Sequence, residues 1–223
     1  MTSFAARVRR ACTPVRLVLL ALALSALGPG RAAAAQGATD GPFEVALRLG
    51  VAFSSALLED SVGPGADPVT ATPGAGAMVG LSAALRVRPR LHVEFELGWA
   101  GVDLAAADGR ASWTADELGV LQGALLARLP FGRRFYGRGG VGLIRYAGER
   151  EGGFLADDAQ THPYATAGVG AEHRAGRVRL FAELNGQAHR FSFRDLREAG
   201  GESGTVWRGL FQAGAAVPLG GGS

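Results

Sequence analysis

The sequence of 223 residues contains no lysine, one asparagine and one cysteine. The cysteine, Cys12, lies in an N-terminal segment that we expect to be removed. The rest of the chain then offers no thiol for a disulfide, a thiolate metal site or a cysteine nucleophile. An apolar run of about 20 residues, the length of a membrane-spanning helix, is also lacking, and so is an amphipathic segment of helical period. These absences argue against a thiol-based site and against a helical membrane protein.

The first 35 residues have the organisation of a secretory signal peptide. Four arginines precede the apolar run 17–27, and small residues follow this run as far as Ala35. A run of this length is too short for a membrane anchor. We therefore predict cleavage after Ala35, followed by a flexible N-terminal segment over residues 36–41.

Removal of this segment changes the charge balance. The whole chain has 23 basic and 20 acidic residues, and five of the arginines but none of the acids lie in residues 1–35. The other 188 residues therefore carry 18 basic and 20 acidic side chains, a net charge of −2. The basic character of the full chain gives no reason to expect a nucleic-acid partner.

Residues 90–101 show the clearest alternation of apolar and polar side chains. An alternation of period 2 predicts a β-strand whose two faces meet different environments, and about 9–11 tilted residues cross a bilayer. We predict that one face is lipid-facing, comprising Leu91, Val93, Phe95, Leu97 and Trp99. The opposite face holds His92, Glu94 and Glu96.

Eight segments with this kind of pattern follow one another: 43–53, 76–88, 90–101, 117–129, 134–146, 164–173, 177–189 and 205–219. The connections between them alternate in length. Tight turns are expected at 89, 130–133 and 175–176, and longer polar loops at 54–73, 103–116, 148–161 and 194–204. An even number of strands with short turns on one side and long loops on the other is typical of outer-membrane barrels.

The predicted fold is therefore all-β: an eight-stranded antiparallel up-and-down transmembrane β-barrel over residues 42–219. It has four long extracellular loops, three short periplasmic turns and a disordered tail at 220–223. The barrel must close, because hydrocarbon offers no partner for the backbone groups of an open sheet edge.

The signal peptide, the eight alternating segments and the short-turn, long-loop rhythm resemble the small eight-stranded outer-membrane β-barrel family, the OmpA-transmembrane and OmpX-like group. The resemblance implies a Gram-negative outer-membrane location and a non-enzymatic role in envelope integrity or in surface interaction through the loops. The implied partners are outer-membrane lipids including lipopolysaccharide, the barrel-assembly machinery and an extracellular ligand at the loops. Such barrels end on an aromatic residue, whereas this chain has Leu219 followed by Gly-Gly-Gly-Ser.

The interior of an eight-stranded barrel is just wide enough to be filled by side chains. We predict an Arg–Glu network in a polar lumen that does not conduct, with strand glycines such as Gly170 and Gly214 making room for the long arginines. The predicted lumen residues are Arg48, Arg86, His92, Glu94, Glu96, Arg138, Glu172, Arg179, Glu183, Gln187, Arg208 and Gln212.

No catalytic, cofactor-binding or metal-binding residue is predicted. Residues 137–142 match G-x-G-x-x-G, but no βαβ unit surrounds them, so they are interpreted as strand glycines. The four histidines have no metal-ligand spacing. One alternative function is a lipid A-modifying enzyme that uses His189 and Ser192, although the lipid A deacylase family has the closer spacing His-x-Ser.

A second alternative is a soluble, lipocalin-like periplasmic barrel that binds a small ligand. Its apolar side chains would point inward, and Glu94, Glu96, Arg179 and Glu183 would point outward. Aromatic residues near the strand ends favour the membrane barrel, because girdles of aromatic residues lie at the two membrane interfaces. These residues are Phe43, Phe53, Trp99, Phe135, Tyr136, Tyr146, Tyr164, Phe191, Phe193 and Trp207.

Overall fold

The computed structural model describes residues 42–61, 68–108, 110–148, 159–191 and 204–219. These residues form ten strands and no helix. The described part of the chain therefore has no helix that could span a membrane. The strands are β1 (Phe43–Ser54), β2 (Leu58–Ser61), β3 (Pro68–Pro73), β4 (Gly76–Arg88), β5 (Leu91–Ala107), β6 (Ser112–Phe131), β7 (Phe135–Gly148), β8 (Gln160–Ala175), β9 (Val178–Phe191) and β10 (Gly204–Leu219). The predicted signal peptide, the segment 36–41 and the tail lie outside the described residues.

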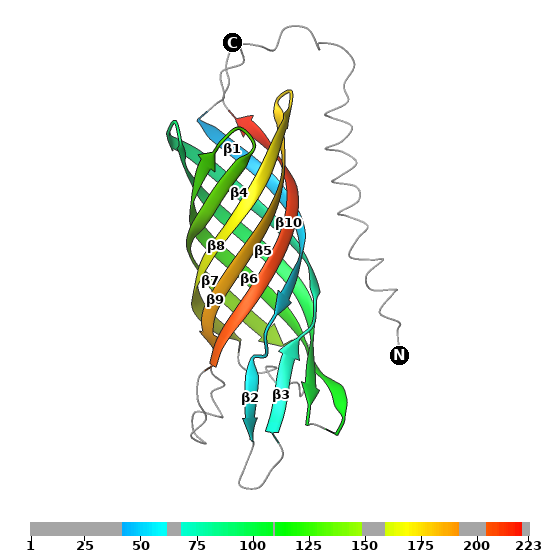
Figure 1. Ribbon diagram of the computed structural model, residues 1–223. Coiled ribbons are helices and arrows are strands. Elements are labelled where there is room, and N and C mark those ends of the chain that lie inside the picture. The colour runs from blue at the N-terminus through cyan, green and yellow to red at the C-terminus, as the bar shows by residue number, and fades with distance from the viewer. Residues whose placement is uncertain (1–41, 62–67, 109, 149–158, 192–203, 220–223) are drawn as a thin grey trace. The chain divides into compact units, whose positions relative to one another are not determined.

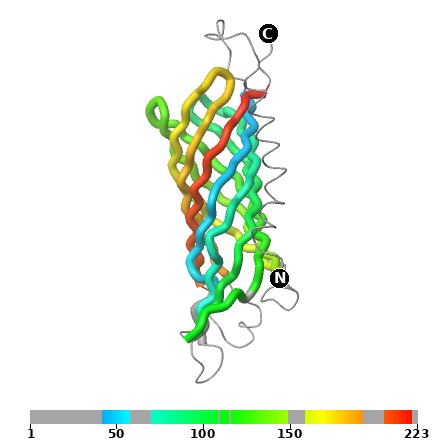
Figure 2. Tube along the Cα trace, turned by 90° about the vertical axis from the view of Figure 1, so that its right-hand side faces the viewer, coloured from blue at the N-terminus to red at the C-terminus, as the bar shows by residue number. Residues whose placement is uncertain are grey.

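Eight of the strands form a closed antiparallel barrel (Figures 1 and 2). From β4 to β10 each strand pairs with the next one along the chain, and β1 pairs with both β4 and β10. The closing pair runs in continuous register from Phe43↔Leu219 to Ser54↔Arg208. The predicted fold class, an all-β eight-stranded up-and-down barrel, is confirmed.

Alternation of the side chains explains why the sheet closes. On β5, Phe95, Leu97 and Trp99 are about half exposed, whereas Glu94 and Glu96 are buried. The other strands also carry large apolar side chains on the exterior, and the interior holds buried charged side chains together with apolar ones. This distribution is the reverse of that in a water-soluble barrel.

Two of the predicted loops contain strands. Within 54–73, β2 and β3 form a hairpin, and β3 pairs with the end of β5 from Thr70↔Ala107 to Pro73↔Leu104. In Figure 1 this hairpin extends beyond the barrel at the end opposite the short turns.

The predicted loop 103–116 is also wrong in most of its length, because β5 continues to Ala107 and β6 starts at Ser112. The two strands stay paired as far as Ala107↔Ser112. The carboxylate of Asp108 accepts hydrogen bonds from the backbone N–H groups of Arg110 (2.9 Å) and Ala111 (2.8 Å), which closes the connection as a tight turn.

Two of the short turns depend on glycine. Gly132 and Gly176 have φ angles of 74° and 62°, in the left-handed region that other residues adopt only at a cost. Each follows a strand end, at Phe131 and Ala175, and lets the chain reverse within a few residues. Tight reversals fix the register of the strands on either side.

Candidate functional site

The lumen of the barrel is the candidate site, and its centre is a network of two arginines and three glutamates. Arg48 from β1 bonds to Glu94 and Glu183, and Arg138 from β7 bonds to Glu96 and Glu183. Longer ion pairs join Arg48 to Glu96 (3.5 Å) and Arg138 to Glu94 (3.7 Å). Because these five residues come from β1, β5, β7 and β9, the network spans the interior from wall to wall.

Neutral side chains complete the network. The hydroxyl of Tyr136 donates to Oε1 of Glu183 at 2.5 Å, and Nε of Arg48 donates to the hydroxyl of Ser82 at 3.1 Å. The ring of Phe181 is near two guanidinium groups, with the Cζ of Arg48 4.7 Å and that of Arg179 4.9 Å from its centroid. Buried charges are tolerated only when they are paired and hydrogen-bonded in this way.

A second ionic layer lies toward the short turns. Arg179 holds both carboxylate oxygens of Glu44 at 2.8 Å, and Arg128 donates to the same carboxylate at 3.0 Å. Nδ1 of His92 is 3.1 Å from Nη2 of Arg128, and Glu172 pairs with Arg179 at 3.5 Å.

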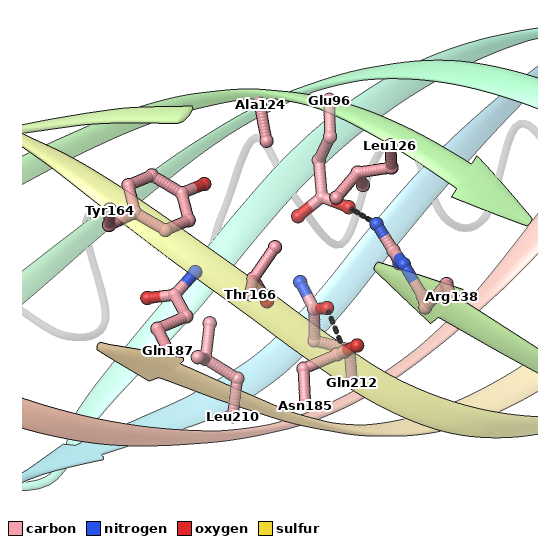
Figure 3. Close-up of a pocket in the computed structure, with 10 residues that line it drawn as sticks. All are labelled: Glu96, Ala124, Leu126, Arg138, Tyr164, Thr166, Asn185, Gln187, Leu210 and Gln212. Atoms are coloured by element: carbon pink, nitrogen blue, oxygen red, sulfur yellow. Dashed lines mark hydrogen bonds and ion pairs between the residues drawn. The ribbon is translucent and has the colours of Figure 1, made fainter. Parts of the chain in front are cut away.

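Amide side chains fill the lumen on the other side of the central network. Arg208 donates to the amide oxygens of Gln122 (3.1 Å) and Gln187 (3.0 Å), and Asn185 donates to Gln212 at 3.1 Å. Figure 3 shows three of these amides, Asn185, Gln187 and Gln212, around a cavity of about 10 Å³ next to the Glu96–Arg138 pair. A space of this size accommodates about one water molecule.

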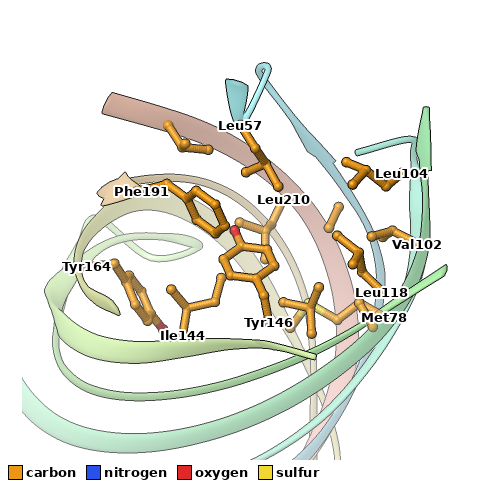
Figure 4. Packing of buried hydrophobic residues seen from close by; sticks show 14 of the residues in the cluster. Leu57, Met78, Val102, Leu104, Leu118, Ile144, Tyr146, Tyr164, Phe191 and Leu210 are labelled. Carbon is orange, nitrogen blue, oxygen red and sulfur yellow. The ribbon is translucent and has the colours of Figure 1, made fainter. Parts of the chain in front are cut away.

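Toward the long loops the interior becomes apolar and aromatic (Figure 4). Tyr146 packs edge-on against Phe191, with centroids 5.4 Å apart, and its hydroxyl lies 3.0 Å from Nε2 of His189. His162 lies near the same rings, and its Nε2 and the Nδ1 of His189 are buried without a hydrogen-bond partner in the described part of the chain. The lumen therefore has a charged part and an apolar part.

A second cavity of about 10 Å³ lies beside this apolar part, in the wall. The pairing of β1 with β4 ends at Ala52↔Gly76, whereas β1 continues along β10 to Ser54. The cavity is lined by residues from both sides of this divergence, Ser54 on β1 and Gly74 before β4, and by interior residues of other strands, among them Val120 of β6.

The structure places all twelve predicted lumen residues on the interior side of the sheet. Arg86, His92 and Glu172, near the short turns, are partly exposed, and the other nine are buried. Eleven of the twelve lie in the ionic layers or the amide layer described above, Glu172 through its pair with Arg179, and Arg86 also has an interaction partner.

Sequence reasoning missed several residues of the site. They include Glu44, Arg128, Gln122, Asn185 and Tyr136. Glu44, Tyr136 and Asn185 have the same parity as a predicted lumen residue on their own strands, so the alternation contained the signal for them. Gln122 and Arg128 lie on β6, where no lumen residue was predicted.

The predicted lipid-facing residues lie on the outer face of β5. Phe95, Leu97 and Trp99 are exposed there, and Leu91 and Val93 are partly exposed. Comparable side chains on other strands include Leu81, Val141 and Trp207, each more than 60% exposed.

Two expectations about side-chain packing are corrected. A Cβ atom on Gly170 would lie 2.4 Å from the ring of Tyr136, and one on Gly214 would lie 2.4 Å from the ring of Phe181, so these glycines make room for aromatic rings rather than for arginines. Four of the aromatic residues assigned to girdles point into the barrel, namely Tyr136, Tyr146, Tyr164 and Phe191. Phe193 lies outside the described residues.

The residues considered for catalysis, metal binding and phosphate binding lie as follows in the structure. His189 points into the lumen, and Ser192 lies outside the described residues. No three His, Cys, Asp or Glu side chains among the described residues are placed to hold a metal ion. Residues 137–142 lie within β7 and make no phosphate-binding loop.

Comparisons with known proteins show similarity of fold. No protein-family model and no curated protein matches the chain. Among solved structures, the outer membrane protein OprG from Pseudomonas aeruginosa is 15% identical (TM-score 0.53; 82% of this chain and 97% of that chain). The outer membrane protein AlkL in DMPC bilayers is 16% identical (0.55; 86% and 96%), as is Neisserial surface protein A (0.50; 80% and 98%). The chain thus has the fold of small outer-membrane β-barrels.

Proposed function

We propose that this protein is a non-enzymatic outer-membrane β-barrel whose lumen is closed to solutes and whose long connections act at the cell surface. The main support for the proposal is that the same barrel has an apolar exterior and an interior crossed by a buried ionic network. In water, an exterior of this kind would expose far more apolar surface than a soluble protein tolerates.

The closed lumen follows from how the central network is held. Glu183 accepts hydrogen bonds from Arg48, Arg138 and Tyr136, and all four side chains are buried. A solute crossing this layer would have to break ion pairs in a region of low dielectric constant, where separating one costs several kcal/mol. Function is therefore assigned to the loop end, consistent with envelope integrity or surface interaction.

The two alternative functions are less well supported. A lipocalin-like barrel needs apolar residues inside and Glu94, Glu96, Arg179 and Glu183 outside, whereas these four are buried within the lumen. A lipid-hydrolysing enzyme needs its histidine where it can reach lipid, whereas His189 is buried next to Tyr146.

Conductance in planar bilayers tests the closed lumen. The purified protein is expected to insert without stable conductance steps. The double variant R48A/E183A, which removes the centre of the network while balancing charge, is expected to show small steps. A variant with exposed Arg145 replaced, R145A, serves as the control and should remain silent. Large, stable steps from the unmodified protein would contradict the proposal.

A second candidate function is the passage of small apolar molecules from the loop end through the wall. It is favoured by the apolar part of the lumen and by the cavity where β1 and β4 diverge. A molecule entering there meets the ionic layers below it, so the wall beside this cavity is the route that avoids them. The substitution V120W should fill this region and reduce binding of the apolar fluorophore N-phenyl-1-naphthylamine, and V141W on the outer face should not. Equal binding by both folded variants would exclude this candidate.

A further inference from the structure

The three short turns together carry a dense group of exposed arginines. These are Arg88, Arg90, Arg133, Arg134, Arg174 and Arg177, which we call the turn arginines. Residues 88–90, 131–135 and 174–177 contain no acidic residue. All three turns lie at the same end of the barrel (Figure 1). This end therefore presents a concentrated positive charge.

Three carboxylates on the strands that end at or begin near this end of the barrel bind guanidinium groups inside it. Glu44 accepts from Arg179 and Arg128, and Glu172 pairs with Arg179. Glu94, which follows the first of the turns, is buried in the central network. Among the described residues, Glu44, Glu94 and Glu172 are thus held by interior guanidinium groups, whereas the turn arginines are exposed.

An apolar collar adjoins the turn arginines on the outer surface. Phe131 and Phe135 flank Arg133 and Arg134, and their rings stack with centroids 6.3 Å apart and an angle of 15° between the planes. Both rings are more than half exposed, as is Val87 next to Arg88. Aromatic residues of this kind lie at the interface of a bilayer, and arginine stems extend from there to the headgroups.

We propose that the turn arginines bind the phosphate groups of anionic phospholipids in the leaflet next to the short turns. The inference rests on the proposed membrane location. A guanidinium group can hydrogen-bond two phosphate oxygens at once. The arginines of the three turns can therefore bind the phosphates of several lipid headgroups. Among the described residues at the opposite end, the exposed arginines are Arg110, Arg145 and Arg190. That end also has the acidic residues Asp103 and Glu117, so its described residues are of mixed charge.

The test compares two variants with the same change of charge. R90Q/R133Q/R177Q removes one arginine from each short turn, and R110Q/R145Q/R190Q removes three exposed arginines from the other end. Folded protein in a nonionic detergent is titrated with short-chain phosphatidylglycerol and, separately, with phosphatidylcholine of the same chain length, and bound lipid is counted by native mass spectrometry.

Each arginine near an anionic surface changes affinity about fivefold. The turn variant should therefore bind phosphatidylglycerol at least tenfold more weakly than the unmodified protein, with phosphatidylcholine binding unchanged. The control variant should stay within about twofold. Equal losses in the two variants, or none in the turn variant, would overturn the proposal.

Competition separates a lipid site from a free-phosphate site. Glycerol 3-phosphate and inorganic phosphate should displace phosphatidylglycerol only at a large excess, and displacement at equal concentration would also overturn the proposal. All variants are first inserted into phosphatidylcholine vesicles and checked for heat-modifiable gel migration. Insertion without a preference for phosphatidylglycerol refutes only this inference, whereas failure of the unmodified protein to insert refutes the proposed function itself.

Discussion

Replacement of Arg138 by methionine is expected to destabilise the barrel strongly. Arg138 contacts all three glutamates of the central network, and it is buried. In the variant R138M, Arg48 alone faces Glu94, Glu96 and Glu183. Removal of one partner from a buried ion pair costs about 3–5 kcal/mol, because the remaining charge is left uncompensated.

The measurement is equilibrium urea unfolding of the barrel in phospholipid vesicles, followed by tryptophan fluorescence. R145M provides the matched control, because Arg145 is on the same strand but exposed, and its loss should change the free energy of unfolding by no more than about 0.5 kcal/mol. The double variant R138M/E96Q removes one charge of each sign and should recover about 0.5–3 kcal/mol of the loss.

A loss below about 1 kcal/mol for R138M would refute this reasoning. It would mean that the carboxylates are hydrated rather than desolvated. The absence of any recovery in the double variant would show that Arg138 acts through packing and not through its charge.

Two further predictions concern local structure. G170A should place a methyl group against the ring of Tyr136 and lower the free energy of unfolding by about 1–3 kcal/mol, whereas G186A, whose added methyl group meets only Ala167 O at 3.9 Å, should be close to neutral in the same urea assay. The backbone N–H groups of Ala111 and Arg110 lower the pKa of Asp108, so their hydrogen bonds should persist while the pH falls below the ordinary value of 3.8 and be lost as it passes the lowered pKa. The protection factor of the Ala111 amide, its NMR exchange rate relative to the intrinsic rate at the same pH, should fall only at that stage, and D108N should lower it already at neutral pH. Protection factors that are equal in the two proteins at every pH would contradict the role of the carboxylate.

The period-2 alternation predicted the barrel and the orientation of its charged residues. Arg48, Glu94 and Glu183 each lie between two apolar residues in the sequence. The alternation therefore predicted directly that their side chains face the interior. On β7 the glycines at 137, 139, 140 and 142 leave few side chains to show the pattern, and the inward orientation of Tyr136 and Tyr146 was missed. Tyrosine is also ambiguous, since it suits both an interface and a buried site with a hydrogen-bond partner.

Long-range pairing limited the prediction of the loops. The β2–β3 hairpin depends on β3 lying beside the end of β5, a contact between residues more than 30 positions apart. The polar, proline-containing stretch 54–73 has no residue pattern that indicates pairing with β5. Which arginine pairs with which glutamate depends in the same way on the shear of the closed barrel, and a single strand does not contain this information.

The central claim is that the apolar exterior faces lipid while the charged side chains face inward. Quenching of tryptophan fluorescence by brominated phospholipid tests it directly in single-tryptophan variants that keep Trp99, Trp113 or Trp207. Trp99 and Trp207 lie on the outer face of β5 and β10. Trp113 lies at the start of β6, opposite Ala106 and beyond the pairings of β4 with β5 and of β6 with β7. We expect strong quenching of Trp99 and Trp207 and weak quenching of Trp113, whereas equally weak quenching of all three would contradict the membrane-embedded barrel.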